Sequence, residues 1–283
     1  MPNNQFWTQI GFPTSLNEDF DNFGAALIAG DFDGDGLADL SIGVPNEDIG
    51  TTSNTGRVNT LYGSFIGLTD FGSQIWDQDA LVSSPAEEFD LFGFSLIAAD
   101  FNGDGYDDMA VGAPGEDWNT IGSAGVVNVV YGSFFGLDSA GNQLWTENDT
   151  TVLGTPEVGD RFGATLAAGD FDGDGFDDLA IGAPNEDSGI VTDAGKVNIL
   201  YGSFSGLTSF GDQEIFDSGI ESFDLFGSSL TTGDFDGDGF DDLAIGAPDE
   251  DLPGGVDAGA VSVVYGSFSG LNPADRQFWN QDS

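Results

Sequence analysis

The chain contains no cysteine and no histidine, and its only basic residues are Arg57, Arg161, Lys196 and Arg276. The absence of Cys and His excludes disulfides, thiolate nucleophiles, imidazole bases and the usual zinc, iron and copper sites. The scarcity of Lys and Arg, against 50 Asp and Glu and a net charge of -46, argues against phosphate backbones and anionic lipids as partners. We therefore expect no nucleic-acid partner and no membrane insertion.

Long hydrophobic runs are also lacking, and no stretch is long enough to span a bilayer. The N-terminus lacks a basic start followed by an apolar run, so the given chain shows no signal peptide. Either a signal was removed, export uses another route, or the chain is a piece of a longer one. Hydrophobic residues nevertheless make up 39% of the 283 residues, including 25 Phe, which is enough to form a substantial core.

One pattern recurs four times along the chain, with first aspartates at Asp31, Asp100, Asp170 and Asp234. We predict a single domain over 1–283, with repeats at approximately 21–89, 90–159, 160–223 and 224–283. Each copy contains short strand-like segments separated by Gly, Asp, Asn and Pro; in the third copy they lie near 163–169, 178–183, 196–201 and 213–217. This pattern predicts an all-β fold, a β-propeller of four blades, each a four-stranded antiparallel sheet.

Two further repeated features fit blades around an axis. Glycines recur inside the second strand, where another backbone can approach closely, and phenylalanines recur as wedges between blades: Gly43, Gly112, Gly182 and Gly246; Phe32, Phe101, Phe171 and Phe235. The outer-strand segment occurs five times, for example at Gln5–Trp7 and Gln277–Trp279. We therefore expect residues 1–20 to contribute to ring closure by a terminal strand, which would leave no exposed edge.

The clearest chemical signal is a nine-residue loop, Asp-x-Asp/Asn-x-Asp-Gly-x-x-Asp. Alternating carboxylates with Gly at the sixth position wrap a hard cation, and the seventh residue offers its backbone carbonyl. The predicted metal ligands are Asp31, Asp33, Asp35, Leu37 and Asp39; Asp100, Asn102, Asp104, Tyr106 and Asp108; Asp170, Asp172, Asp174, Phe176 and Asp178; and Asp234, Asp236, Asp238, Phe240 and Asp242.

Calcium suits this loop better than magnesium, because six or more oxygens lie in a flexible arc. The EF-hand Glu at the twelfth position is replaced by Ile42, Val111, Ile181 and Ile245, so the loop belongs to a β-hairpin. Asp and Gly also favour turns without metal, but four repetitions of one spacing argue against that alternative. We predict about four structural Ca²⁺ ions, one per repeat. Sites of extracellular affinity would be empty in the cytosol, so an extracellular or cell-surface location is expected.

The loop is flanked by Phe-Gly and Gly-x-Pro pairs in every copy, as at Phe162-Gly163 and Gly182-Ala183-Pro184. With the aspartate loop between them, these residues resemble the FG-GAP repeats of the integrin alpha-subunit propeller and its bacterial relatives. The resemblance implies calcium in the hairpin joining the first two strands, and ligand-binding loops on the opposite face. Those loops contain an acidic pair in each copy, which we expect to be structural or solvated. Trp118 is the candidate ligand contact because the other copies lack a counterpart. Integrin propellers have seven repeats, whereas this chain has four.

The preferred function is a calcium-binding extracellular adhesion or ligand-binding module that is not an enzyme and has no catalytic residues. Two alternatives stay open: a multivalent carbohydrate-binding lectin, and a non-catalytic or catalytic domain of a polysaccharide-degrading enzyme. The partner would be a protein or a glycan. We expect a monomeric ring, with a homodimer that completes a larger ring as the alternative.

Overall fold

The computed structural model describes residues 4–9, 18–81, 85–147, 152–217, 219, 221–252 and 255–281. Within these ranges there is no α-helix and no helix that could cross a membrane, and a 3-10 turn, η2, spans Gln78–Ala80. The strands are β1 (Ala26–Gly30), β2 (Asp39–Val44), β3 (Arg57–Tyr62), β4 (Thr69–Trp76), β5 (Ser95–Ala99), β6 (Asp108–Ala113), β7 (Val126–Tyr131), β8 (Asp138–Trp145), β9 (Thr165–Gly169), β10 (Asp178–Ala183), β11 (Lys196–Tyr201), β12 (Thr208–Ile215), β13 (Ser229–Gly233), β14 (Asp242–Ala247), β15 (Ala260–Tyr265) and β16 (Asn272–Asn280).

These strands form four antiparallel sheets, each pairing four consecutive strands in chain order. The all-β prediction of four-stranded propeller blades is confirmed. The second and third strands match the third-copy prediction, but β12 begins at Thr208, earlier than the expected residue 213. A shift in register between Ile199 and Tyr201 lets Tyr201 pair with Thr208, which extends the outer strand. The assignment of 1–283 to one domain stays a prediction.

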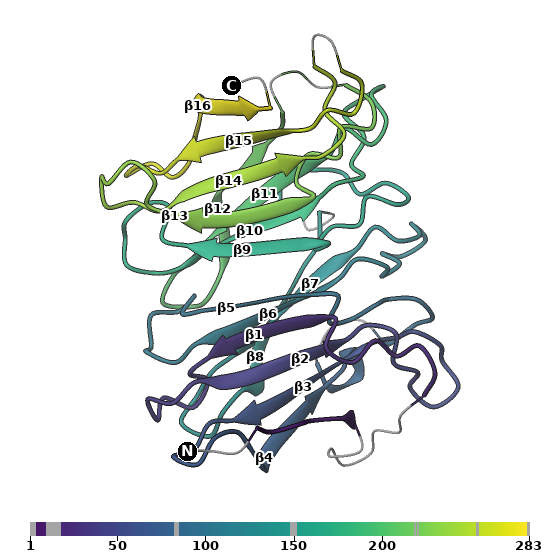
Figure 1. Ribbon diagram of the computed structural model, residues 1–283, viewed down its shortest axis with the longest axis vertical. Helices are drawn as coiled ribbons and strands as arrows, with labels where there is room; N and C mark the ends of the chain where they lie inside the picture. The colour runs from purple at the N-terminus through teal and green to yellow at the C-terminus, as the bar shows by residue number, and fades with distance from the viewer. Residues whose placement is uncertain are drawn as a thin grey trace.

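The blades pack through their inner strands, with β1 against β5, β5 against β9, and β9 against β13 (Figure 1). A hydrophobic cluster fills each of the three junctions. Phe32, Phe101 and Phe171 are fully buried in these clusters, which agrees with the wedge role expected from the sequence. The central strands β6, β7, β10 and β11 are buried along their whole length because a blade covers each of their faces.

Close contact between blades explains the glycine in the second strand. A Cβ atom built on Gly112 would lie 2.1 Å from the carbonyl oxygen of Gly163 in the next blade. The same clash arises between Gly43 and the carbonyl oxygen of Gly93, at 2.2 Å. Any larger residue would therefore push neighbouring blades apart.

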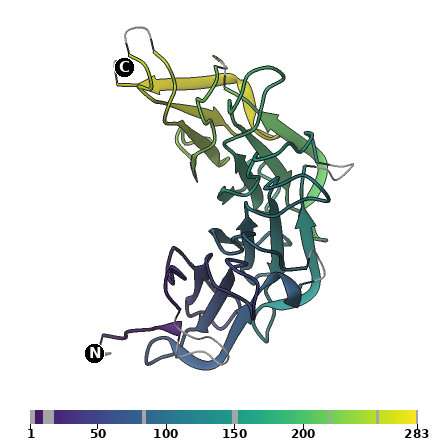
Figure 2. The same cartoon turned by 90° about the vertical axis from the view of Figure 1, so that its right-hand side faces the viewer.

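The row of blades is an open arc, with the chain ends at its two tips (Figure 2). This differs from the closed ring expected from the sequence. The outer face of the fourth blade shows the consequence: Phe235 is 51% exposed, whereas its three counterparts are fully buried. Alternate residues of β15 are likewise only partly buried or exposed. The last blade already contains its own outer strand, β16, so no terminal segment is needed to complete it.

The described part of the N-terminal segment lies against the first blade. The Gln5 amide donates to the Leu68 carbonyl at 2.7 Å, as the Gln74 amide of β4 does to the Leu137 carbonyl at 2.8 Å. Trp7 packs on a small cluster formed around Ile42 and Leu61. Residues 5–9 thus occupy the place that the outer strand of a preceding blade would take. Residues 1–3 and 10–17 of the predicted closing segment lie outside the described residues.

Candidate metal centres

Each aspartate loop joins the first and second strands of a blade. In the third copy Asp170 follows β9 directly and Asp178 begins β10, so the hairpin geometry brings the two ends of the loop together. Gly173 and Gly175 have positive φ angles, of 71° and 92°, which lets the chain turn sharply between them. The local sequence therefore forms a tight loop at one end of the sheet.

Hydrogen bonds from the backbone hold the carboxylates in place. Asp170 Oδ2 accepts from Gly175 N at 3.1 Å, and Asp172 Oδ1 accepts from Asp174 N at 3.1 Å. Asp178 accepts from Phe171 N through Oδ2 and from Gly202 N through Oδ1, both at 2.8 Å. The ninth aspartate thus ties the loop to the end of the third strand.

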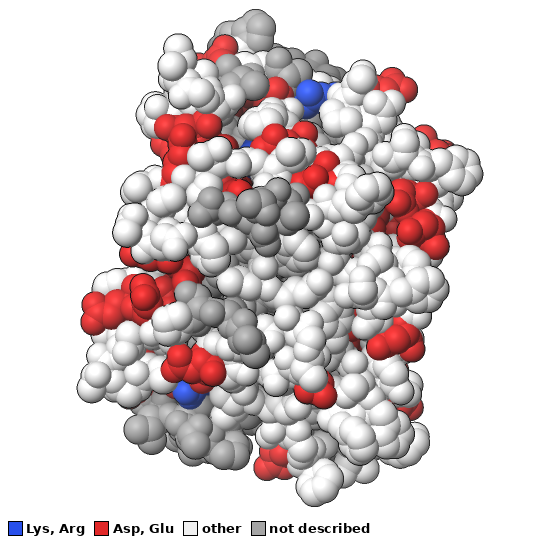
Figure 3. Space-filling model, turned by 180° about the vertical axis from the view of Figure 1, so that it is seen from behind, with Lys and Arg blue, Asp and Glu red and all other residues white. Residues whose placement is uncertain are grey.

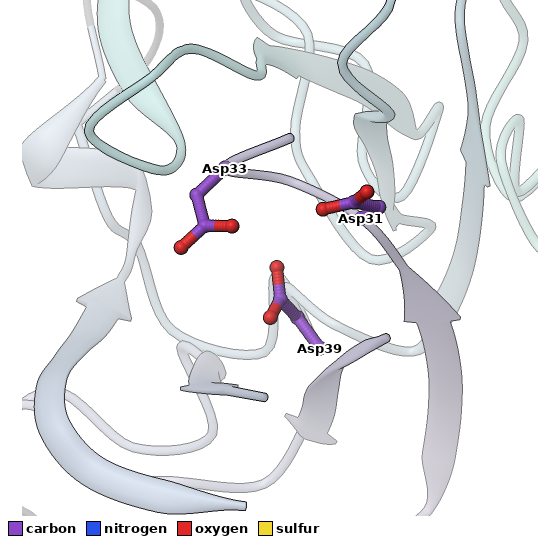
Figure 4. A group of neighbouring side chains, drawn as sticks. All are labelled: Asp31, Asp33 and Asp39. Carbon is purple, nitrogen blue, oxygen red and sulfur yellow. The ribbon is translucent and has the colours of Figure 1, made fainter. Parts of the chain in front are cut away.

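Three carboxylates converge in three of the four loops, with ligand oxygens within 4.8 Å of one another. They come from the first, third and ninth loop positions, and Figure 4 shows the three side chains of the first copy turned toward a common space. The groups are Asp31, Asp33 and Asp39; Asp170, Asp172 and Asp178; and Asp234, Asp236 and Asp242. This spacing suits oxygens that share one calcium ion at 2.3–2.6 Å.

The fifth-position aspartates, Asp35, Asp174 and Asp238, are not in these groups. Asp174 Oδ1 instead accepts a hydrogen bond from Phe176 N at 3.0 Å, and Asp35 and Asp238 bind the corresponding backbone nitrogens. The second loop has Asn102 at the third position, yet it keeps the same backbone hydrogen bonds to Asp100, Asn102, Asp104 and Asp108. All four loops therefore share one scaffold, and the predicted carbonyl ligands at Leu37, Tyr106, Phe176 and Phe240 stay a prediction.

The carboxylates are held close together in a partly dehydrated site. Burial, with smaller contributions from the Asp172 and Asp170 charges, raises the pKa of Asp178 to about 8. Burial likewise raises the pKa of Asp108 to about 8 and that of Asp39 to about 6. A bound cation would relieve this repulsion and compensate the lost hydration. Asp31 Oδ1 is also buried without a protein hydrogen-bond partner, so a ligand position is left open in the first loop.

A link between neighbouring loops was missed from the sequence. The eighth loop residue Asp107 accepts a hydrogen bond from Asp31 N of the preceding blade at 2.7 Å. Asp177 and Asp241 repeat this contact with the backbone nitrogens of Asp100 and Asp170. In the sequence, the Asp-Asp pair at the end of each later loop was the feature that could have indicated this link. The first loop has Ala38 at this position, since it faces no preceding loop in the described structure.

Trp118 and the recurring acidic pair lie in the loops between the second and third strands. Trp118 is half-buried and packs against the hydrophobic cluster of the first two blades. Glu47, Glu116, Glu186 and Glu250 are buried, and each following aspartate caps a backbone nitrogen in its own loop. These contacts agree with a structural role for the acidic pair and favour a packing role for Trp118.

Repeated four-stranded blades with an aspartate hairpin on each define a propeller-type repeat protein. The FG-GAP repeat model matches residues 23–58, 92–130, 162–200 and 226–264, which together cover more than half of the chain. The chain belongs to the FG-GAP repeat family. The expected resemblance is confirmed.

The relatives include phospholipases as well as integrin alpha subunits. The chain is 37% identical over 190 residues to phosphatidylinositol-glycan-specific phospholipase D of Rattus norvegicus, covering 65% of this chain and 22% of that protein. It is 32% identical over 231 residues to integrin alpha-5 of Xenopus laevis, covering 80% of this chain and 20% of that protein. The chain thus spans about a fifth of the length of these relatives.

A rhamnogalacturonan lyase of Bacillus licheniformis has a similar chain path. The alignment has a TM-score of 0.47 and 14% identity, and it covers 90% of this chain and 48% of the lyase. A likeness at this level says nothing about activity.

Proposed function

We propose that the chain is a calcium-stabilised ligand-binding module, of the adhesion type, that acts outside the cell. The observation that carries the proposal is the convergence of three carboxylates in the hairpins of the first, third and fourth blades, with the same scaffold in the hairpin of the second blade. All candidate ligands are oxygens on a loop with two glycines, which fits calcium better than a small octahedral ion. Asp33, Asp172 and Asp236 would bind the ion together with the first and ninth aspartates of their loops, and Asn102 would take the same place in the second blade.

The expected role of the ion is structural. It would neutralise carboxylates that repel one another and clamp the hairpin whose ninth aspartate already holds the third strand. With a dissociation constant of about 0.1 mM, calcium at about 1 mM would add roughly 1.4 kcal/mol per site, or roughly 5–6 kcal/mol for about four sites. This is comparable with the net stability of an ordinary domain.

A ligand would most naturally bind the strand-linking loops away from the hairpins. Integrin alpha subunits among the relatives support a protein ligand. Red acidic patches cover parts of the rear face and few basic atoms are visible there, so a partner with basic groups would be favoured on that side (Figure 3).

We infer that the module itself is non-catalytic. Its carboxylates recur in equivalent positions from blade to blade, and the chain has neither Cys nor His. One group of relatives bears an enzyme name, but the shared region is a small part of those proteins.

Thermal melting with and without a chelator tests the calcium proposal. Millimolar calcium should raise the melting temperature, and Asp172→Ala should reduce that rise by the contribution of one site, roughly 2–5 °C. Asp70→Ala, at an exposed position of β4, is the matched control and should keep the full response. Equal stabilisation by magnesium, or an unchanged response of Asp172→Ala, would refute the assignment.

A further inference from the structure

A second buried acidic cluster lies in each blade, apart from the aspartate hairpin, where the blade meets the preceding blade or, in the first blade, the N-terminal segment. These four junctions are numbered by blade. Each combines a residue just after an outer strand, an aspartate ahead of the Phe-Gly pair, and the glutamate of the acidic pair. The members are Gln9, Asp21 and Glu47; Gln78, Asp90 and Glu116; Glu147, Asp160 and Glu186; and Asp217, Asp224 and Glu250, all of them no more than 6% exposed. Carboxylates this deeply buried require a compensating partner.

The first and third clusters contain their own cation. Arg57 Nη1 lies 2.9 Å from Glu47 Oε1 at the first junction. At the third, the fully buried Lys196 Nζ lies 3.0 Å from Glu186 Oε1 and 3.3 Å from Glu147 Oε1. Both basic residues begin the third strand of their blade, where Arg57 pairs with Val44 and Lys196 with Ala183. This strand position therefore supplies the positive charge.

The second cluster contains an amide donor in place of a cation. Gln78 Nε2 donates to Glu116 Oε2 at 2.6 Å, as Gln9 Nε2 does to Glu47 Oε2 at the first junction. The residue at the start of its third strand is Val126, paired with Ala113. A glutamine after the outer strand thus partly compensates the acidic group.

The fourth cluster has neither a basic residue at the start of the third strand nor a glutamine after the outer strand. Ala260 begins the third strand, paired with Ala247, and the residue after the outer strand is Asp217 in place of glutamine. Arg276 lies close in the fold, but it donates to the Phe216 carbonyl at 2.7 Å. Among the described residues, no Lys or Arg forms an ion pair with Asp217, Asp224 or Glu250.

Two side chains of this cluster have oxygens left without a partner. Asp217 Oδ1 and Glu250 Oε2 are buried and accept no hydrogen bond from the described residues. Both residues are only 5% exposed. The other oxygen of each carboxylate lies beside Gly219: a Cβ built there would be 3.2 Å from Asp217 Oδ2, which accepts from Gly219 N at 2.6 Å, and 3.2 Å from Glu250 Oε1. The two carboxylates therefore lie close together, and each keeps one buried oxygen without a donor.

We propose that Asp217, Asp224 and Glu250 bind a hard metal cation of the calcium class in the place where Arg57 and Lys196 supply a positive charge at other junctions. In the third cluster, oxygens of Glu147, Asp160 and Glu186 lie within 4.8 Å of one another, and Lys196 contacts two of these side chains. The fourth group is not gathered to that spacing. An entering ion would draw the two free oxygens together.

Burial and like charges act together on the carboxylates of this cluster. Burial, followed by the charges of Asp217 and Asp224, raises the pKa of Glu250 to about 7. Burial also raises the pKa of Asp224. Like-charged carboxylates in a dehydrated site favour a cation among them.

Counting bound ions in matched variants tests the proposal. Equilibrium dialysis against ⁴⁵Ca²⁺ should show that Glu250→Gln and Ala260→Lys each bind about one ion fewer per chain than the parent protein. The introduced ammonium of Ala260→Lys should also raise the melting temperature in chelator, because it reproduces the arrangement around Lys196. Glu221→Gln, an exposed acidic neighbour, should bind the full number.

Asp236→Ala, in the aspartate hairpin of the same blade, separates this site from the hairpin sites. If the hairpins bind no calcium, Asp236→Ala binds as many ions as the parent, while Glu250→Gln still loses its ion. Ala260→Met controls for side-chain size, and Glu250→Gln decides the matter if Ala260→Lys does not fold. Equal numbers of bound ions in the parent and in folded Glu250→Gln would overturn the proposal.

Discussion

Lys196 Nζ lies 3.0 Å from Glu186 Oε1, and both side chains are buried between the second and third blades. The same ammonium also contacts Glu147 and Glu214. One of only four basic residues in a chain with 50 acidic ones is thus placed at the centre of an acidic cluster inside the molecule. Its charge stabilises a junction that would otherwise contain only repelling carboxylates.

Lys196→Met should lower the free energy of unfolding by about 3–5 kcal/mol, because the substitution leaves buried carboxylates without their cation. Urea denaturation monitored by tryptophan fluorescence measures the loss. Arg161→Met is the control: its guanidinium stacks 5.5 Å from the Phe94 ring centroid and should contribute under about 1 kcal/mol. Similar losses in the two variants would mean that the buried cluster has no special requirement for a cation.

Gly112→Ala and Gly246→Ala form a matched pair that tests the open arc. At both glycines a new Cβ would meet a serine hydroxyl of its own blade at 2.2 Å, which can rotate away. Only at Gly112 would it also meet the backbone carbonyl of the next blade, at 2.1 Å. We therefore expect Gly112→Ala to lower the free energy of unfolding by about 3 kcal/mol or more, and Gly246→Ala to lower it by about 1 kcal/mol. Equal costs, measured by thermal melting, would indicate that another blade covers Gly246 in solution.

Trp7→Ala should destabilise the first blade by about 2 kcal/mol, because Trp7 covers Ile42 and Leu61 as an outer strand of a preceding blade would. Hydrogen exchange should increase in β2 and β3 and stay unchanged in β14 and β15. Phe6→Ala is the control, since Phe6 is 90% exposed. If Trp7→Ala instead loosens the fourth blade, the N-terminal segment closes the ring after all.

The free energy of unfolding in chelator should fall as the pH rises from about 4 to about 8. Burial, followed by the Glu116 charge, raises the pKa of Asp90 to about 8, whereas an unfolded aspartate has a pKa of about 3.9. The folded state therefore binds more protons than the unfolded state within this window, and the stability from that protonation is lost as the pH rises through the folded-state value. Each such group contributes a slope of up to about 1.4 kcal/mol per pH unit.

Glu116→Gln should flatten this profile, because it removes the charge that repels the Asp90 carboxylate. Urea denaturation at pH 5 and pH 8 measures the difference, and the exposed Glu88→Gln should follow the parent profile. A Glu116→Gln profile as steep as that of the parent would show that the Glu116 charge does not raise the pKa of Asp90.

Repetition made the blade architecture and the aspartate hairpins predictable. A nine-residue spacing that recurs four times specifies its own local turn, and the second and third strands of the third copy, 178–183 and 196–201, were located correctly because period and turn residues agree there. The start of β12 was misplaced because a change of register depends on how strands pair and not on composition.

The amino-acid sequence by itself determined the elements that depend on neighbouring residues: the strands, the hairpins, and the carboxylates at their first, third and ninth positions. Only the tertiary structure decided that the blades form an open arc, that Asp107 binds the preceding loop, and that Lys196 lies among buried carboxylates. Those features depend on contacts between residues tens of positions apart, and each repeat looks much the same in sequence whether or not a neighbour covers its face. Phe235 illustrates the limit, because it shares its repeat position with three fully buried phenylalanines and is nevertheless half exposed.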